Sequence, residues 1–183
     1  MTTRAAVFQA LAAGHDLQEV QDRFQLTPAQ LQELFQEVAD HFRDLEEGVW
    51  SLYCDGASRG NPGQAGAGVV LVDACGDIRV QYGEYLGQTT NNVAEYQALI
   101  LGLNMALNLG VKKIQVFADS ELLVRQLKGR YQVKAAHLRP LYEAATAALK
   151  EFESSGISHV PRAENYLADR QANRAIDRKL GVG

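Results

Sequence analysis

Acidic residues stand at four points of the 183-residue chain where an ionised side chain is costly. Asp55 and Asp119 each end an apolar stretch typical of a strand, and Glu95 and Asp169 lie in line with small or apolar residues at helical spacing. Carboxylates that a fold brings together repel one another and lose hydration, so they are normally tolerated only where cations neutralise them. Hard divalent ions such as Mg²⁺ prefer oxygen ligands. The four acids therefore predict a metal-dependent phosphoryl-transfer enzyme.

Each acid, taken alone, also has an ordinary structural explanation. Asp119 precedes SELLV and would serve as the N-cap of a helix there. Glu95 could be a solvent-facing residue of a first helical turn, where the helix dipole favours an acid. Asp169 could pair with Arg162 or Arg170. The residue types leave these alternatives open.

The length and composition indicate a globular protein with one full domain and a small additional one. Hydrophobic residues make up 46% of the chain and charged residues 22%. No apolar run approaches the roughly 20 residues that cross a bilayer, and the N-terminus resembles no signal peptide. Cys54 and Cys75 lack metal-binding spacing and are predicted to be reduced, buried thiols. We therefore expect a cytoplasmic protein that does not associate with a membrane.

Residues 1–48 are predicted to form a separate all-α module of three short helices. The second and third helices begin with capping boxes, which pair Asp16 with Glu19 and Thr27 with Gln30. The outline DLQEVQDRFQLTPAQLQELF superficially resembles a helix-turn-helix.

The charge of this module opposes DNA reading. It holds 3 basic and 9 acidic residues, a balance of −6, whereas a DNA reader presents basic residues to phosphates. A protein-contact or self-association module and a merely packed extension are the alternatives. Residues 49–183 hold 15 basic and 13 acidic residues, and this balance is not by itself a nucleic-acid footprint.

Residues 49–183 are predicted to form an α/β domain. Three alternating apolar stretches over about residues 49–86 indicate antiparallel strands joined by short turns, one of them GNPG at 60–63. The whole order βββαβααβα predicts a mixed five-stranded sheet with flanking helices. The later elements are expected as helices over about 92–109, 120–129, 137–155 and 164–180 and strands over about 112–119 and 156–161.

Four phrases within residues 49–181 follow one another in a known order and spacing: DGASRGNPG, TTNNVAEYQALI, DSELLVRQL and HVPRAEN…AD. Together they resemble the type I ribonuclease H family, and within it the compact archaeal-like branch. The resemblance implies a ribonuclease H-like fold and an endoribonuclease that hydrolyses the RNA strand of RNA/DNA hybrids, leaving 5′-phosphate and 3′-hydroxyl ends. It also implies that Asp55, Glu95, Asp119 and Asp169 are catalytic and bind two Mg²⁺ ions, with Mn²⁺ as a substitute.

The resemblance assigns further residues to the substrate. Asn61, Asn91 and Asn92 match family positions that touch the minor groove of the hybrid, and Thr90 matches one near a DNA phosphate. Ser120 is another candidate for the groove. Discrimination between the strands would come from the 2′-hydroxyl of RNA. From the residues alone, capping of a helix by Asn91 or Asn92 is an equal alternative.

The chain departs from the family pattern at two places. Many bacterial members carry a mobile catalytic His before the last acid, and a gapless match puts His159 there. A shorter loop instead keeps His159 in a strand and gives this area to Arg162, which becomes a candidate for substrate contact. The basic handle that holds substrate in many members is reduced to Lys128, Arg130 and Lys134. We therefore expect weaker hybrid affinity, with salt-sensitive contacts supplied from elsewhere in the chain.

A hybrid-specific endoribonuclease is the leading hypothesis. One rival is a catalytically weak nucleic-acid-binding module of the same fold, which would not need to keep four repelling acids. Another rival, a regulatory DNA-binding protein that uses residues 1–48, lacks a basic recognition helix. A nuclease for double-stranded RNA or RNA–DNA junctions has the same sequence signature as the leading hypothesis. The expected partners are an RNA/DNA hybrid and, through residues 1–48, another protein or a second copy of the chain.

Overall fold

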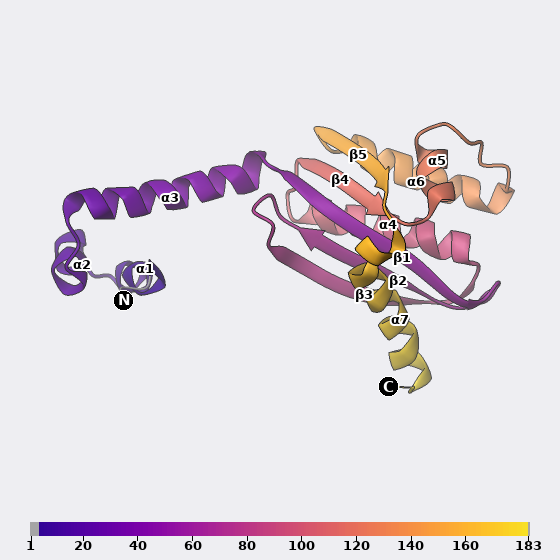
Figure 1. The fold of residues 1–183 in the computed structure, drawn as a ribbon, viewed down its shortest axis with the longest axis horizontal. Helices are drawn as coiled ribbons and strands as arrows, with labels where there is room; N and C mark the ends of the chain where they lie inside the picture. Colours follow the sequence, from indigo (N-terminus) through magenta and orange to yellow (C-terminus); the bar gives the residue numbers. More distant parts are fainter. Residues whose placement is uncertain (1–3, 183) are drawn as a thin grey trace. The chain divides into compact units, whose positions relative to one another are not determined.

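The structure, a computed structural model, describes residues 4–182 and divides the chain into two compact units, residues 1–44 and 45–183. The first three residues of the predicted module 1–48 and Gly183, the end of the predicted α/β domain, lie outside the described residues. Figure 1 labels the helices and strands of both units.

The chain begins with helices α1 (Arg4–Ala12), α2 (Leu17–Phe24) and α3 (Pro28–Glu47). Both predicted capping boxes are present. The Asp16 side chain accepts from the Glu19 N–H at 2.8 Å, and the Glu19 carboxylate accepts from the Asp16 N–H at 3.4 Å. Thr27 and Gln30 exchange the same pair of hydrogen bonds at 3.2 and 2.9 Å. These local bonds satisfy backbone donors that a helix start leaves without partners.

The smaller unit has a core of its own. Val7, Ala10, Val20 and Leu31 are buried together. The rings of Phe8 and Phe35 also meet edge to face, with centroids 5.8 Å apart. The unit therefore holds its helices together with few buried side chains.

The larger unit contains a five-stranded sheet whose strands lie in the order β3-β2-β1-β4-β5. β1, β2 and β3 form an antiparallel meander, and β4 and β5 add in parallel to β1. The predicted element order and mixed sheet are confirmed. The elements are β1 (Val49–Gly60), β2 (Gly63–Val72), β3 (Ile78–Thr89), α4 (Asn91–Asn108), β4 (Lys113–Ala118), α5 (Glu121–Leu127), the 3₁₀ turn η1 (Ala136–Leu138), α6 (Arg139–Lys150), β5 (Ser154–His159), the 3₁₀ turn η2 (Arg162–Glu164) and α7 (Tyr166–Leu180).

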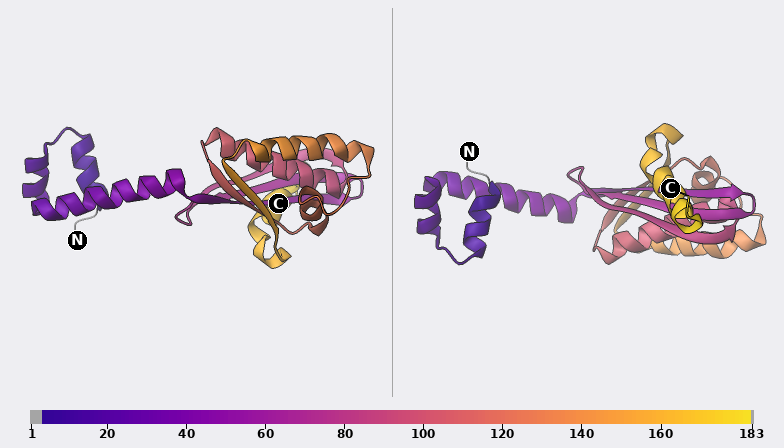
Figure 2. Two further views of the ribbon diagram at one scale, coloured as in Figure 1. Left: turned by 90° about the horizontal axis from the view of Figure 1, so that it is seen from above. Right: turned by 90° about the horizontal axis from the view of Figure 1, so that it is seen from below.

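Helices cover both faces of this sheet. α4 packs on β1 and β2 and is itself packed against α6, whereas α7 packs on β2, β3 and β1. Figure 2 shows α7 on the face opposite to α4 and α6. Successive residues of a strand point to opposite faces. Strand β1, at the centre of the sheet, therefore presents alternate residues to α4 and to α7.

Three features differ from the sequence-based expectations. The helix expected over about 137–155 ends at Lys150, and Ser154 and Ser155 already belong to strand β5. Strand β1 continues to Gly60 instead of ending at Asp55, because β2 pairs with it along this whole stretch as far as Gly63. Cys54 is buried as predicted, but Cys75 is exposed in the turn that joins β2 to β3.

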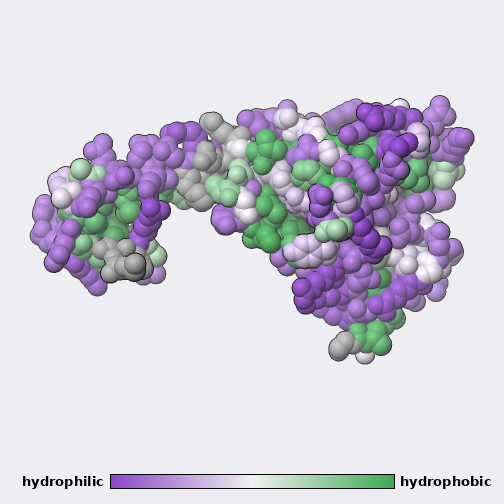
Figure 3. All heavy atoms as spheres, in the orientation of Figure 1, coloured by the Kyte–Doolittle hydropathy of each residue, from purple (hydrophilic) through white to green (hydrophobic). Residues whose placement is uncertain are grey.

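Among the described residues, no helix is long and apolar enough to cross a bilayer. Figure 3 shows apolar side chains interspersed with hydrophilic ones on the visible face.

Candidate active site

Asp55 lies in the middle of the central strand. The expectation that it ends a strand was wrong, because the small and polar residues after it continue the ladder with β2, where Asp55 pairs with Gly68. Its side chain points to the face that α7 covers, since a Cβ added at Gly68, its neighbour in the register, would run into the Ala168 carbonyl oxygen of α7 at 1.9 Å. Only 5% of Asp55 is exposed.

Glu95 reaches the same place from α4. A Cβ at Gly56 would lie 2.1 Å from the Glu95 nitrogen, so only glycine at this position lets α4 approach β1 so closely. The Gly56 N–H donates to the Glu95 carboxylate at 3.3 Å. Glu95 is 5% exposed, and the alternative of a solvent-facing glutamate is therefore wrong.

Asp119 follows β4, the strand that runs parallel to β1. It is not the cap of α5, because the Ser120 side chain accepts from the Leu123 N–H and takes that role. The side-chain amide of Asn165 donates to Asp119 at 3.0 Å and to the Cys54 carbonyl oxygen at 2.9 Å. Asn165 is 1% exposed, so it ties the Asp119 carboxylate to β1 from within the core.

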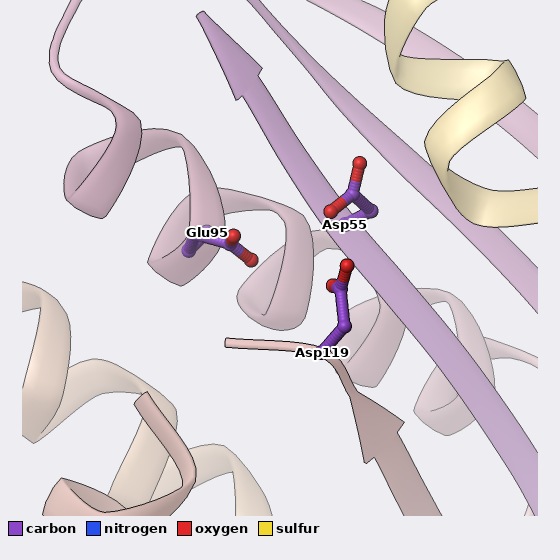
Figure 4. Close-up of side chains that lie close together, drawn as sticks. All are labelled: Asp55, Glu95 and Asp119. Atoms are coloured by element: carbon purple, nitrogen blue, oxygen red, sulfur yellow. The ribbon is translucent and has the colours of Figure 1, made fainter. Parts of the chain in front are cut away.

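These three acids form one cluster, which Figure 4 shows with the carboxylates turned toward one another. Asp55, Glu95 and Asp119 can each offer a carboxylate oxygen, and all of these oxygens lie within 4.8 Å of one another. Burial raises the pKa of Asp55 to about 7, and the charges of Asp119 and Asp169 add to that effect. Burial, followed by the charges of Asp55 and Asp119, also holds the pKa of Glu95 well above its usual range. Both shifts mean that ionised acids at this place need a cation.

Asp169 lies near this cluster but is held differently. It is on α7, and its side chain is 26% exposed and forms an ion pair with Arg162 of η2. This pair is one of the ordinary explanations that the sequence left open, and the structure contains it. Hydrogen bonding to Asp169 and its charge raise the pKa of Arg162. Asp169 is therefore not one of the three clustered acids in the described structure.

All four acids nevertheless line one cavity of about 420 Å³. It is formed by Asp55, Gly56, Ala57, Ser58, Asn91, Glu95, Asp119, Ser120, Arg162, Asp169 and Asn173. The three clustered acids come from β1, α4 and the end of β4, and Asp169 comes from α7 on the other side of the sheet. The fold thus brings acids that are far apart in sequence to a single opening.

The predicted substrate residues divide into two groups. Asn91, Ser120 and Arg162 line the cavity, and the Asn91 amide reaches Glu95 at 3.5 Å. Asn61, Thr90 and Asn92 are not among its lining residues in the described chain.

The second group surrounds the start of α4. Asn61, in the β1–β2 turn, accepts from the Asn91 N–H at 3.2 Å, so this turn is fastened to the first residue of the helix. Thr90 caps α4 by accepting from the Val93 N–H at 3.4 Å, and the alternative of an Asn cap is therefore wrong. Asn92 is exposed beside them.

His159 stays in the sheet, as predicted from the shorter loop. It is the last residue of β5, is exposed, and pairs in register with Ala118. It does not line the cavity among the described residues, whereas Arg162 does.

Sequence reasoning missed three polar residues of the site. Asn165 supports Asp119, while Ser58 and Asn173 line the cavity. Asn165 precedes Asp169 by one helical turn within AENYLAD, and this spacing was a signal that could have drawn attention to it. Asn173 follows Asp169 by the same spacing and carried the same signal, whereas Ser58 lies in a strand and carried none.

The donor set fits divalent cations. It offers carboxylate oxygens from three buried or half-buried acids, with a fourth acid at the rim, and includes no thiolate or imidazole. Hard ions such as Mg²⁺ and Mn²⁺ prefer ligands of this kind.

Comparisons with known proteins agree with this geometry. Residues 53–175 match the family model described as Reverse transcriptase-like. Ribonuclease HI of Halobacterium salinarum is 45% identical over 125 residues, which are 68% of this chain and 63% of that protein. Ribonuclease H of Coxiella burnetii is 34% identical over 158 residues, covering 75% of this chain and 96% of its own length.

Solved structures give the same result for the fold. The crystal structure of RNase H1 from Halobacterium salinarum is similar with a TM-score of 0.70 and 44% identity, covering 72% of this chain and 99% of that one. LC11-RNase H1, crystallised in complex with an RNA/DNA hybrid, is similar with a TM-score of 0.68 and 40% identity, covering 72% of this chain and 99% of that one.

The relatives differ in length from this chain. It spans 63% of the Halobacterium ribonuclease HI and 35% of a similar bifunctional protein of Mycobacterium tuberculosis. The matched residues 53–175 nevertheless contain most of the sheet and of the covering helices and all four acids of the cavity. The chain therefore belongs to the ribonuclease HI family.

Proposed function

We propose that this protein is a metal-dependent endoribonuclease that hydrolyses the RNA strand of RNA/DNA hybrids. The observation that carries the proposal is the cluster of Asp55, Glu95 and Asp119, whose carboxylate oxygens lie within 4.8 Å of one another. Membership of the ribonuclease HI family supports the reaction, and the hybrid bound to LC11-RNase H1 supports the substrate.

In this proposal, Asp55, Glu95, Asp119 and Asp169 hold two Mg²⁺ ions, which Mn²⁺ can replace. When bound, the ions would activate a water molecule and stabilise the leaving 3′-oxygen of the scissile bond. Gly56 and Asn165 keep Glu95 and Asp119 in position through their hydrogen bonds. The products carry 5′-phosphate and 3′-hydroxyl ends.

The substrate residues of the proposal line the cavity or lie around the start of α4. Asn61, Asn91 and Asn92 would contact the minor groove, with Ser120 as another candidate for the groove, and Thr90 would lie close to a DNA phosphate. Their amides and hydroxyls both donate and accept hydrogen bonds, which suits recognition of 2′-hydroxyls. Arg162, whose side chain is 75% exposed, would move between Asp169 and a phosphate of the substrate.

Residues 1–48 have a separate role in this proposal. The boundary between the module and the catalytic domain lies near residue 48, and the acidic module mediates contact with another protein or a second copy of the chain. A cytoplasmic location stays a prediction from the sequence.

The test is a cleavage assay with Mg²⁺ or Mn²⁺ on a hybrid, double-stranded RNA and single-stranded RNA of the same sequence. We expect cleavage of the hybrid alone, and loss of that cleavage in Asp119→Asn without loss of the fold. Undiminished cleavage by Asp119→Asn would refute the assignment. If the protein prefers double-stranded RNA, the proposed reaction stands and the proposed substrate is wrong.

A further inference from the structure

Helix α7 carries a row of positive charge that the proposed reaction does not use. Arg170, Arg174 and Arg178 are exposed and follow one another at four-residue spacing, which places them on one side of the helix. The residues that α7 buries against the sheet include Ala168, Ala172 and Ile176, on the opposite side. We call the three exposed residues the α7 arginine stripe. Figure 3 shows strongly hydrophilic surface in the region where Figure 1 places α7.

The acids of α7 do not neutralise this stripe. Asp169 pairs with Arg162, and Asp177 pairs with Arg59 of β1. Both acids of the helix are therefore occupied by arginines from other elements. Within the described part of the chain, no ion pair involves a member of the stripe.

Like charges four residues apart destabilise an isolated helix, so an uncompensated row of three arginines is unfavourable for folding. The larger unit otherwise pairs several of its arginines, for example Arg79 with Asp73 and Arg125 with Glu121. The unpaired stripe therefore points to an anionic ligand that compensates its charge in the working protein.

The position of the stripe indicates which anion this is. Asp169 and Asn173, which line the cavity, are each followed directly by a member of the stripe, Arg170 and Arg174, about 100° further around the helix. The stripe thus continues the rim of the cavity along α7. From Arg170 to Arg178 it spans about 12 Å, which is the length of three to four base pairs along a duplex.

We propose that the α7 arginine stripe binds the phosphate backbone of the hybrid beside the cleavage site. This inference rests on the proposed function and deepens it, because it names the surface that holds one arm of the duplex. It also supplies the salt-sensitive contacts that the reduced handle near Lys128 leaves missing. Arginine suits this role because its guanidinium group binds phosphate oxygens in pairs.

The test measures hybrid binding without cleavage, in an Asp119→Asn background, at several salt concentrations. In Arg170→Gln/Arg174→Gln/Arg178→Gln we expect the Kd to rise about tenfold or more near 0.1 M salt. The slope of log K against log salt should fall by about 2 to 3, because each lost phosphate contact removes about 0.9. Circular dichroism checks that the variant is folded, which its exposed positions favour.

A matched control removes three exposed positive charges from elements that do not line the cavity, Lys112→Gln/Arg139→Gln/Lys150→Gln. It changes the net charge equally, and its Kd should stay within about twofold of the parent. If it weakens binding as much as the stripe variant does, the effect is one of net charge and the inference fails.

A second comparison uses Lys128→Gln/Arg130→Gln/Lys134→Gln, which removes the remaining charges of the handle. We expect a smaller loss of affinity here than in the stripe variant, and the opposite order would overturn the inference. With hybrids that extend fewer than about three base pairs beyond the cleavage site, the stripe variant and its parent should have the same Kd.

The outcomes separate this inference from the proposed function. If the protein with Asp119 cleaves the hybrid, but the stripe variant binds it as tightly as its Asp119→Asn parent does, only the inference is wrong. If the protein with Asp119 does not cleave the hybrid and the Asp119→Asn parent does not bind it, the proposed function itself fails.

Discussion

The buried and the exposed parts of the candidate site hold their charges in different ways. Asp55 and Glu95 are each 5% exposed and lie beside Asp119, and no ion pair among the described residues relieves the repulsion of these acids. The side chain of Asp169 is 26% exposed and already has Arg162 as its partner. The comparison suggests that the buried acids depend on cations, whereas Asp169 exchanges one positive partner for another.

The largest effect is expected from the buried part. Asp55→Asn should reduce the cleavage rate by about 10³-fold or more, because an acid that holds the catalytic cation is lost. The same variant should be more stable than the parent without divalent ions, since a buried repulsion disappears. Rate measurements and urea unfolding check both results. Glu143→Gln, an exposed acid of α6, is the control that should change neither.

The stability of the metal-free protein should depend on pH. The pKa of Asp55 is raised from 3.8 to about 7, so the folded protein keeps a proton that the unfolded chain releases. The resulting stability is fully present below about pH 4 and is lost as the pH rises through 7, by up to about 4 kcal/mol. Glu95 adds an effect of the same sign. Unfolding in a chelator between pH 4 and 8 measures this loss.

Two outcomes would contradict this expectation. A flat profile in the chelator would mean that the buried acids are not coupled as the structure indicates. An unchanged profile after saturation with Mg²⁺ would mean that cations do not relieve the repulsion, and the distinction between the two parts of the site would disappear.

Two glycine variants test separately how α4 positions the buried Glu95 and how α7 positions the exposed Asp169. Gly56→Ala places a methyl group against the Glu95 backbone, and Gly68→Ala places one against Ala168 of α7. Each should lower the free energy of unfolding by about 1–3 kcal/mol, as overpacking does. Gly156→Ala is the control, because the atoms nearest to its added methyl group belong to the flexible side chain of Gln115. Gly56→Ala should also reduce cleavage more than Gly68→Ala. The reverse order would mean that cleavage depends more on the packing of α7 than on the buried position of Glu95.

At the exposed part, Asp169→Asn should reduce cleavage by about 10–100-fold, less than any change in the buried cluster. The smaller loss follows from its partial exposure and its existing partner. Asp177→Asn is a matched control on the same helix, because it breaks the pair with Arg59 outside the cavity. Equal losses in Asp169→Asn and Asp55→Asn would show that all four acids act as one group.

The smallest effect is expected from the N-terminal unit. Deletion of residues 1–44 should change kcat by less than about twofold, because the larger unit has its own core and holds all four acids. A cleavage assay with the shortened chain tests this. Loss of cleavage in a fragment that still folds would mean that the smaller unit completes the site.

Much of the fold could be predicted from local patterns. The capping boxes at Asp16 and Thr27 involve residues three positions apart, so the sequence contains all that they need. The order of strands and helices followed from apolar periodicity and turn residues. The end of β1 could not be predicted, because residues after Asp55 join the strand through pairing with β2 and have no apolar pattern of their own.

The site shows the same division. The four acids could be selected from the sequence because they stand in four phrases that resemble those of type I ribonuclease H, whereas the residue types alone left ordinary explanations open. Their grouping into three and one could not, because it depends on how closely α4 and α7 approach the sheet at Gly56 and Gly68. The contribution of Asn165 was missed for a related reason: its two acceptors lie on β1 and after β4, far from it in sequence.

The glycines beneath α4 and α7 have a consequence for the unfolded chain. Glycine gains more backbone freedom on unfolding than any other residue, and replacing it with alanine often stabilises a protein by limiting that freedom. Alanine cannot stabilise the protein in this way at Gly56 and Gly68, because backbone atoms of α4 and α7 occupy the space of the methyl group. Close packing of α4 and α7 on the sheet therefore requires glycines that raise the conformational entropy of the unfolded chain.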